Sequence, residues 1–437
     1  MERKKKLGLW EAVSIAVGTM IGAGIFSILG VGAEICKQNL YIAFILASLI
    51  AYLVAYSYAK LGTVYVSNAG PIEFILRGIG DNPITGTLAI LMWFSYVISI
   101  SLFAKAFAGY FLALFKLPLS SVYIAIVEVA VISFFTVLNF FGSKAVGKAE
   151  FWIVVVKVSI LLSFVVLGVW SINPEFLKPL ISHKDIVNTF YAASVLFLTY
   201  MGFGLITNAS EDIQDPKKNV PKAIYLSLAI VTFVYVSVAL VAVGNLGYKG
   251  LIEAKEYALA EAAKPFLGQI GFVFVSLGAL FSTASAINAT LYGGANIAYA
   301  LAKEGELPRI FERKVWFQAP EGLYITAVFS LLFAIFFNLN GIANLISTVF
   351  LVIYIFVLIS HFKLVDKVGG KKPFILFNLI VIISVFIILL IYQWKTNKDS
   401  FFTSLSIIFG SFIFELLYRN ITKRKITKRG NSLNYNG

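Results

Sequence analysis

Two long apolar segments of this chain are each interrupted by a cluster of glycines, and that pairing constrains the fold most. The first cluster lies in residues 18–27, which read GTMIGAGIFS, and the second in residues 200–207, which read YMGFGLIT. A helix in lipid must satisfy its own backbone polar groups, so helix-breaking residues there need a compensating reason. Segments interrupted at corresponding places in two halves of a chain are typical of secondary transporters. The pair therefore predicts a carrier of a small solute.

The composition predicts an all-α integral membrane protein. Apolar residues form 59% of the chain and charged residues 13%, against about 25% charged in soluble proteins. A spanning helix needs about 20 mostly apolar residues. We expect twelve such spans, at residues 10–34, 40–62, 84–114, 121–142, 150–171, 186–212, 221–244, 268–300, 322–338, 342–362, 374–394 and 400–418.

The twelve spans can be divided into two units of five, followed by two further helices. An odd number of spans makes the second unit enter the membrane from the opposite side, which gives an inverted repeat. Broken span 1 then faces broken span 6. We expect the first unit at residues 1–171, the second at 172–366 with an external amphipathic helix at 250–266, helices 11 and 12 at 367–420, and a basic tail at 421–437.

A net charge of +14 would by itself suggest nucleic-acid binding, but the positions of the charges along the chain indicate another role. Of the 36 Lys and Arg residues, 25 fall on the side of the N-terminus and 9 on the other side, while Lys105 and Lys157 lie within the bilayer. This asymmetry follows the positive-inside rule. It predicts a multi-pass protein of the cell membrane with both termini cytoplasmic, a basic tail near anionic lipid and no nucleic-acid partner.

Few residues are available for metal or enzyme chemistry. Cys36 is the only cysteine, and His183 and His361 are the only histidines. A membrane-embedded enzyme, the alternative from a different functional class, would need a catalytic set built on an intramembrane histidine, paired aspartates or a nucleophile with its base, and we find no such set in the spans. We therefore expect no enzyme activity, no cofactor and no metal.

The two breaks can form complementary halves of one receptor. Unwinding at Gly22–Gly24 would expose backbone N–H groups at a half-helix N-terminus, which attracts a carboxylate. Unwinding near Met201–Gly204 would free carbonyl oxygens that can accept hydrogen bonds from an ammonium group. Together they would bind a zwitterionic α-amino acid without any charged side chain. The alternative is close helix packing of the small-xxx-small type, as in Gly18 and Gly22.

At these residues the chain resembles the amino acid–polyamine–organocation transporters, and among them the archaeal proton-coupled amino acid transporters. Residues 18–26 (GTMIGAGIF) resemble the first-helix motif of that family, and residues 202–211 (GFGLITNASE) with 215–221 (DPKKNVP) resemble its sixth helix and following loop. Two departures stand out: Asp215 replaces the usual asparagine before proline, and Leu198 stands where members specialised for cationic substrates carry an aromatic residue. The resemblance implies the five-plus-five fold, amino acid transport and proton coupling.

The candidate substrate site is apolar apart from its backbone groups. Phe203, beside the second break, either closes over the substrate or packs as an ordinary aromatic, and Phe103 and Phe107 are further candidates for contact with the substrate side chain. Since no acidic residue lies at either break, we expect neutral amino acids. The expected substrate-binding residues are Met20, Gly22, Ala23, Gly24, Leu198, Thr199, Met201, Phe203 and Gly204.

Lys157 is an ionisable residue in the middle of span 5, where a lysine costs about 2.5–3.5 kcal/mol on insertion scales. Gly18 lies at comparable depth in span 1, and span 8 offers Ser282 near its middle. The family resemblance implies that the lysine ammonium occupies the place of the sodium ion that related carriers bind between the first and eighth helices. Burial makes the protonated amine costly, so it could release its proton as access changes. The alternative is a lysine that snorkels to the inner headgroups.

Other charged residues are expected to be structural. Lys105 and Glu128 lie at similar depth in the outer half of spans 3 and 4, so we expect a buried ion pair. The alternative is a role in proton movement. Glu211 and Asp212 are expected to act as gate or capping groups. The sequence thus predicts proton-coupled import of small neutral amino acids by alternating access, with protons and membrane lipid as partners. An exchanger or uniporter on the same fold stays open, as does the oligomeric state.

Overall fold

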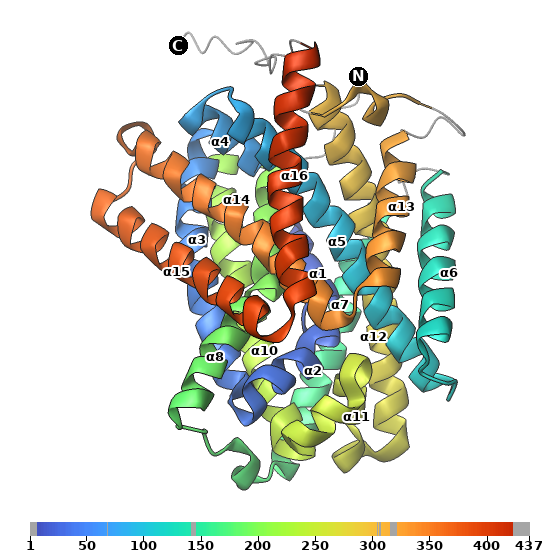
Figure 1. The fold of residues 1–437 in the computed structure, drawn as a ribbon. Helices are drawn as coiled ribbons and strands as arrows, with labels where there is room; N and C mark the ends of the chain where they lie inside the picture. The colour runs from blue at the N-terminus through green and yellow to red at the C-terminus, as the bar shows by residue number, and fades with distance from the viewer. Residues whose placement is uncertain are drawn as a thin grey trace.

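The computed structural model describes residues 7–67, 69–140, 146–303, 305, 307–314 and 321–422, and at residues 23, 140 and 146–151 it describes the backbone alone. The described chain is helical almost throughout (Figure 1). In chain order its α-helices are α1 (Leu9–Ala23), α2 (Ile25–Cys36), α3 (Leu40–Val64), α4 (Pro71–Ile79), α5 (Pro83–Leu114), α6 (Ser121–Phe140), α7 (Val146–Gly168), α8 (His183–Leu196), α9 (Leu205–Asn208), α10 (Pro216–Ala254), α11 (Ala258–Glu261), α12 (Lys264–Lys303), α13 (Glu321–Phe336), α14 (Leu339–Val368), α15 (Lys372–Thr396) and α16 (Lys398–Thr422).

These helices confirm the all-α membrane class. Within the described residues, ten helical stretches are long and apolar enough to cross a membrane, and two shorter apolar helices lie at Leu9–Gly22 and Glu321–Phe336. The shorter ones are the first half of broken span 1 and span 9, so each expected span has a helical counterpart. The end of the expected span at 121–142 lies partly outside the described residues.

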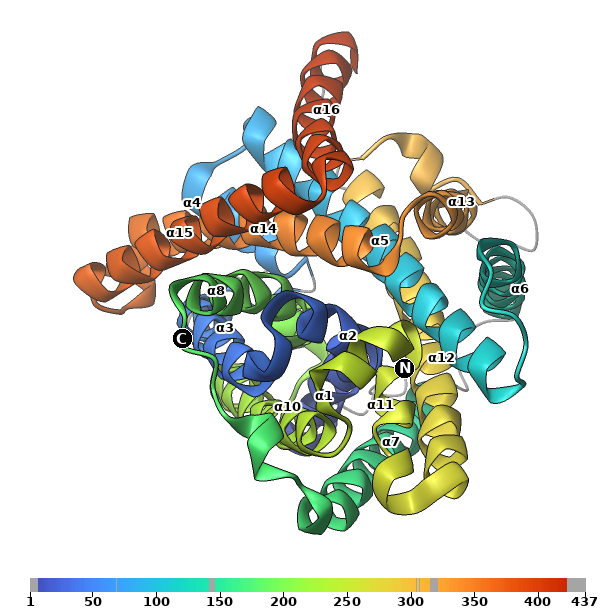
Figure 2. The ribbon, with the colours of Figure 1, turned by 60° about the horizontal axis from the view of Figure 1, so that its bottom comes forward.

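Corresponding spans of the two expected units pack against each other. Helix α3 packs on α10, α5 on α12 and α6 on α13, which pairs spans 2, 3 and 4 with spans 7, 8 and 9. Helices α15 and α16 lie at the outside of the bundle (Figure 2). This arrangement agrees with two units and two added helices, while the unit boundaries stay a prediction.

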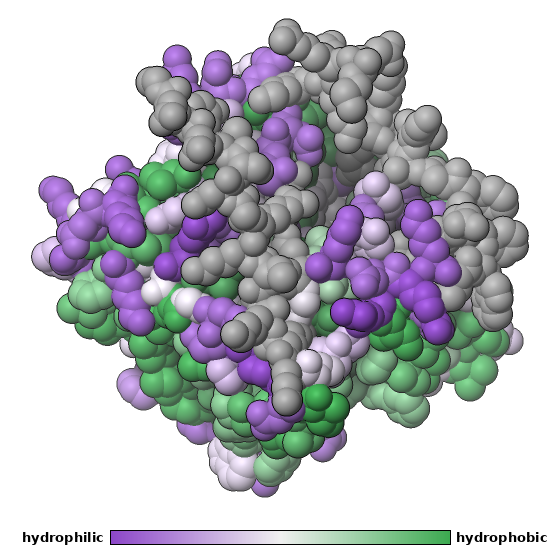
Figure 3. All heavy atoms as spheres, turned by 90° about the horizontal axis from the view of Figure 1, so that it is seen from above, coloured by the Kyte–Doolittle hydropathy of each residue, from purple (hydrophilic) through white to green (hydrophobic). Residues whose placement is uncertain are grey.

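One end of the molecule carries many hydrophilic side chains. Helix α4 and the end of α16 lie at this end (Figure 1), and hydrophilic side chains cover much of the described surface there (Figure 3). The start of the described chain is held close by, since Leu7 N–H donates to Asp212 O at 2.8 Å and Gln214 N–H donates to Leu7 O at 2.8 Å. By the charge distribution, this is the end that we expect in the cytoplasm.

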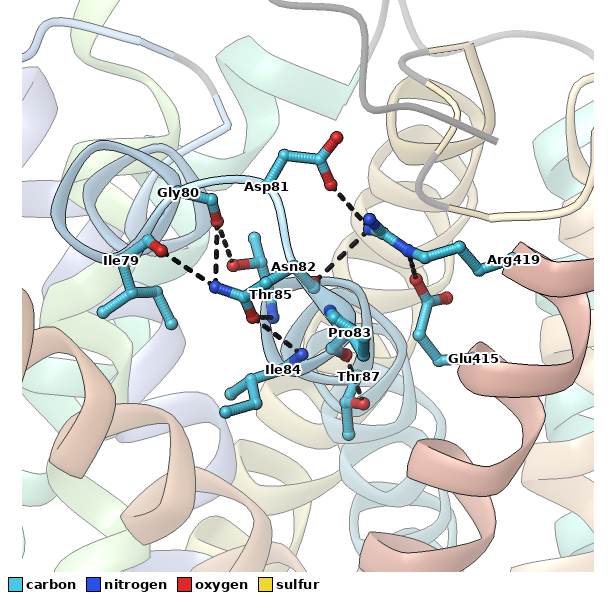
Figure 4. A network of polar contacts seen from close by, with 10 residues as sticks. All are labelled: Ile79, Gly80, Asp81, Asn82, Pro83, Ile84, Thr85, Thr87, Glu415 and Arg419. Carbon is cyan, nitrogen blue, oxygen red and sulfur yellow. Dashed lines mark hydrogen bonds and ion pairs between the residues drawn. The ribbon is translucent and has the colours of Figure 1, made fainter. Parts of the chain in front are cut away.

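An arginine fastens α16 to the turn between α4 and α5 at this polar end (Figure 4). Arg419 pairs with Asp81 at 2.6 Å and with Glu415 at 3.2 Å, and it donates to Asn82 O at 3.3 Å. Asn82 also caps α5, because its side chain accepts from the N–H groups of Ile84 and Thr85. The outer helix is therefore tied to the first turn of α5.

The external segment expected as one amphipathic helix is divided into several short helices. The backbone leaves helical geometry at Gly247 (φ 71°) and Gly268 (φ 60°), and Lys255 adopts φ 46° at the start of the 3₁₀ helix η7 (Lys255–Tyr257). A Cβ on Gly30 would lie 2.5 Å from Lys255 O, and one on Gly109 would lie 2.3 Å from a Glu256 side-chain atom. These glycines let η7 dock closely on α2 and α5, a tertiary contact that favours the breaks.

Candidate functional site

The first helix break is narrower than expected. Helix α1 runs through Ala23 and α2 begins at Ile25, so Gly24 alone separates them, with φ and ψ both −82°. Gly24 N–H still donates to Met20 O at 2.9 Å, which continues the helical pattern up to the break. The expected unwinding over Gly22–Gly24 is therefore a single-residue interruption in this conformation.

The second break is a tightened helix. Residues Phe197–Gly204 form the 3₁₀ helix η5 between α8 and α9. A 3₁₀ stretch within a longer helix has poorer hydrogen-bond geometry and often marks a hinge. The expected site residues of span 6, from Leu198 to Gly204, all lie in η5, and η5 packs against α1.

A tyrosine that the sequence reasoning missed joins the two breaks. The Tyr235 hydroxyl, from α10, donates to Met20 O at 2.5 Å and lies 3.3 Å from Thr199 O. A Cβ on Gly24 would lie 2.3 Å from this hydroxyl. The absence of a side chain at Gly24 therefore makes room for Tyr235, which occupies the place expected for a substrate carboxylate.

Gly22 serves helix packing in this conformation. A Cβ at Gly22 would lie 3.1 Å from Ala286 Cβ and 3.3 Å from Lys157 Nζ. The glycine thus lets α1 approach both α12 and the lysine of α7. This contact agrees with the packing alternative, while the neighbouring Ala23 lies outside the residues whose side chains are described.

A cavity of about 70 Å³ lies beside the breaks, between α1, α3, α5, η5, α12 and α14. One water needs about 10–15 Å³ by the same measure, so the cavity has room for a small solute. Met20, Leu198, Thr199, Met201 and Gly204 are the expected residues that line it, together with Phe103. Its other lining residues are Thr19, Tyr58, Pro71, Met92, Ser95, Tyr96, Ser99, Leu102, Gly202, Leu205, Thr290, Ile346, Phe350 and Tyr354.

Phe203 is not part of the cavity wall. Its side chain is fully buried, with its ring centroid 5.3 Å from that of Tyr58 in an edge-on contact and 6.1 Å from that of Tyr354 in a stacked one. Of the two roles considered for this residue, the structure agrees with an ordinary packing aromatic. Phe107, another candidate, stacks on Phe111 with ring centroids 6.1 Å apart and does not line the cavity either.

The cavity wall is richer in hydroxyl groups than the sequence suggested. Tyr58, Tyr96 and Tyr354 come from three different helices, and the Tyr96 hydroxyl accepts a hydrogen bond from Asn208 Nδ2 at 3.2 Å. No charged side chain lines the cavity among the described residues. In the sequence each tyrosine is one polar tip within an apolar span, and nothing local marks it as facing a site.

Lys157 is buried at the junction of α1, α7 and α12. Its side chain is 2% exposed, and Nζ donates to Gly18 O at 2.5 Å. The Ser282 hydroxyl, expected as a second ligand, is buried and has no hydrogen-bond partner in the described part of the chain. The structure therefore brings Lys157 to Gly18, whereas a bond to the Ser282 hydroxyl is not formed. The burial also argues against snorkelling.

Lys105 and Glu128 form an ion pair at 2.8 Å, with side chains 10% and 1% exposed. They line a second cavity, of about 430 Å³, which Glu253 and Glu256 of the external segment also line. Neither residue of the pair lines the cavity at the helix breaks. Asp212, expected as a gate or capping group, contributes its backbone carbonyl to the contact with Leu7.

Comparisons with known proteins agree over nearly the whole chain. A family model described as amino acid permease matches residues 7–413. An uncharacterized protein of Methanocaldococcus jannaschii is 58% identical over 97% of each chain. An inner membrane transport protein of Escherichia coli is 32% identical over 97% of each chain, and a branched-chain amino acid permease of Lactococcus lactis is 26% identical over 83% of this chain and 82% of its own.

Proposed function

Because the chain belongs to the amino acid permease family, we propose that it imports small neutral, zwitterionic amino acids together with protons, by alternating access. The family and the transporters among its relatives establish amino acid transport by a membrane protein with many spans and exclude an enzyme. The neutral substrate, the proton, the residues of the site, the cell membrane and the cytoplasmic termini belong to this proposal.

The observation that carries the proposal is the cavity beside the two helix breaks. Its described wall combines apolar side chains with hydroxyl groups and contains no charged side chain. A cationic or anionic substrate side chain would lose its hydration there without gaining a partner, which is costly. A neutral side chain meets no such penalty. The Lactococcus lactis relative is named for branched-chain amino acids, which are also neutral.

The substrate's common part would bind where Tyr235 now lies. Helix α2 begins at Ile25, and a helix N-terminus attracts a carboxylate. Met20 O and Thr199 O, which now lie near the Tyr235 hydroxyl, are acceptors that an ammonium group could use. In the proposed cycle the substrate displaces the hydroxyl, which returns when the substrate leaves.

Lys157 would couple this exchange to protons. The protonated amine holds α7 to α1 through Gly18 O, four residues before Gly22. Helices α1, α7 and α12 are in mutual contact at this point. Loss of the proton would remove the charge that strengthens the bond, and α1 could then move relative to α7 and α12. The Ser282 hydroxyl of α12, which makes no hydrogen bond in the described chain, would be a further ligand for the amine in a rearranged state.

The test is uptake by purified protein in liposomes. Common amino acids are screened with and without an imposed inward proton gradient, with empty liposomes as the control. We expect accumulation of neutral amino acids when the gradient is present. Exchange that needs substrate inside the vesicles, or equilibration insensitive to the gradient, would support an exchanger or a uniporter on the same fold. Uptake restricted to charged amino acids would refute the neutral-substrate assignment.

A further inference from the structure

The Tyr354 hydroxyl is a buried polar group without a hydrogen-bond partner in the described chain, and its side chain lines the cavity. The residue is 1% exposed. Aromatic neighbours hold its ring: the centroid of Tyr58 lies 5.6 Å away in an edge-on contact and that of Phe197 lies 5.6 Å away at 69°. Packing therefore fixes the ring and leaves its oxygen unsatisfied.

Such an arrangement destabilises the protein unless something else uses the hydroxyl. A phenylalanine would fill the same aromatic site without a buried polar atom, and a buried hydroxyl that makes no hydrogen bond is unfavourable. Buried polar atoms without partners are few in native proteins, and each calls for a reason such as a ligand or water. Because Tyr354 borders the cavity, the missing partner can lie inside the cavity.

Five other hydroxyl groups of the cavity wall already take part in hydrogen bonds. Four of them each donate to a carbonyl oxygen three or four residues earlier in the chain. They are Thr19, Ser95, Ser99 and Thr199. The Tyr96 hydroxyl accepts from Asn208. Tyr354 thus differs from these groups in having both its donor and its acceptor capacity unused.

We propose that the Tyr354 hydroxyl is a specificity subsite that binds an uncharged polar group on the substrate's side chain. A phenol both donates and accepts a hydrogen bond, so it suits a hydroxyl or carboxamide group. The subsite favours serine, threonine and asparagine over alanine and valine. This inference rests on the proposed function, because it assigns a substrate class to the same cavity.

The experiment measures competition in Tyr354→Phe. Uptake of a radiolabelled neutral amino acid is inhibited by serine, threonine, asparagine, alanine or valine, at equal pH on both sides so that proton coupling does not enter. Loss of one neutral hydrogen bond corresponds to roughly a threefold to tenfold loss of affinity. We expect the half-inhibitory concentrations of serine, threonine and asparagine to rise by that factor relative to those of alanine and valine.

Tyr200→Phe is the matched control, because the Tyr200 hydroxyl is also buried but donates to Phe44 O at 3.1 Å and does not line the cavity. It should leave the selectivity ratio unchanged and lower the melting temperature. If Tyr354→Phe leaves the ratio of half-inhibitory concentrations unchanged, the subsite proposal is wrong, and the hydroxyl bonds to a water molecule and not to the substrate. If the wild type takes up no amino acid, the proposed function fails first, and the subsite fails with it.

Discussion

Replacement of Lys157 by methionine tests proton coupling most directly. Methionine has a similar length and no branch, so it fills most of the space of a side chain that is 2% exposed. It removes the hydrogen bond to Gly18 O, whose length is 2.5 Å. A hydrogen bond to a charged group contributes about 1.5–3 kcal/mol, and relief of the buried charge's desolvation offsets that loss. We therefore expect a folded protein.

The effect of Lys157→Met on transport should be larger than its effect on stability. One pH unit corresponds to about 1.4 kcal/mol, so symport of one proton with one substrate allows roughly tenfold accumulation for each unit of gradient. We expect this accumulation in wild-type liposomes and a ratio near one in Lys157→Met. Substrate binding should survive in the variant, because the proposed contacts come from the helix breaks.

The assay compares three proteins under an inward gradient of one pH unit: wild type, Lys157→Met and Lys105→Met. Lys105 is the matched control, because it is also a buried intramembrane lysine but lies in the ion pair with Glu128. The folded Lys105→Met variant should still accumulate substrate. If Lys157→Met accumulates substrate like the wild type, Lys157 is a structural lysine and the coupling argument is wrong.

Three further measurements test separate parts of the structure. In Gly24→Ala the new Cβ would lie 2.3 Å from the Tyr235 hydroxyl, so we expect overpacking of about 1–3 kcal/mol and lost uptake. Adding Tyr235→Phe should recover part of the melting temperature, and no recovery would argue against this clash. Glu128→Gln should lower the free energy of unfolding by about 3–5 kcal/mol, because it leaves Lys105 unpaired. Replacement of both Lys105 and Glu128 by methionine should restore thermal stability. Equal melting temperatures of the single and double variants would contradict a structural pair. Reporters fused at the C-terminal end and within residues 144–148 should both be cytoplasmic, and an external signal from either one would exclude the expected topology.

The spans could be predicted because membrane insertion depends on local composition. An apolar stretch of sufficient length forms a helix in lipid whatever its neighbours are, since its backbone must bond to itself. The same locality explains the failure over 250–266, where alternating polar and apolar residues read as one amphipathic helix. The breaks there depend on η7 docking against Gly30 and Gly109, a contact between segments far apart in the chain.

The partners of intramembrane charges were predictable to the extent that depth determines them. Counting residues from the ends of the spans placed Lys157 level with Gly18, and Lys105 level with Glu128; the structure has both contacts. The depth of a residue in the membrane does not determine how its helix is rotated about its own axis. The Ser282 hydroxyl lies at a suitable depth, yet it forms no bond to the lysine in this conformation.

The glycine pattern shows most clearly where sequence reasoning ends. A glycine in an apolar span indicates that another group approaches the backbone closely, but it does not identify that group. Beside Gly22 that neighbour is Ala286 with the Lys157 ammonium, whereas beside Gly24 it is the Tyr235 hydroxyl. Tyr235 lies in a run of apolar residues, and its role depends on how α10 packs against α1. Two glycines of one motif, separated by Ala23, thus have different roles in the packing: Gly22 allows a helix contact, and Gly24 makes room for the hydroxyl with which we propose that the substrate competes. This division follows only from the packing of the helices.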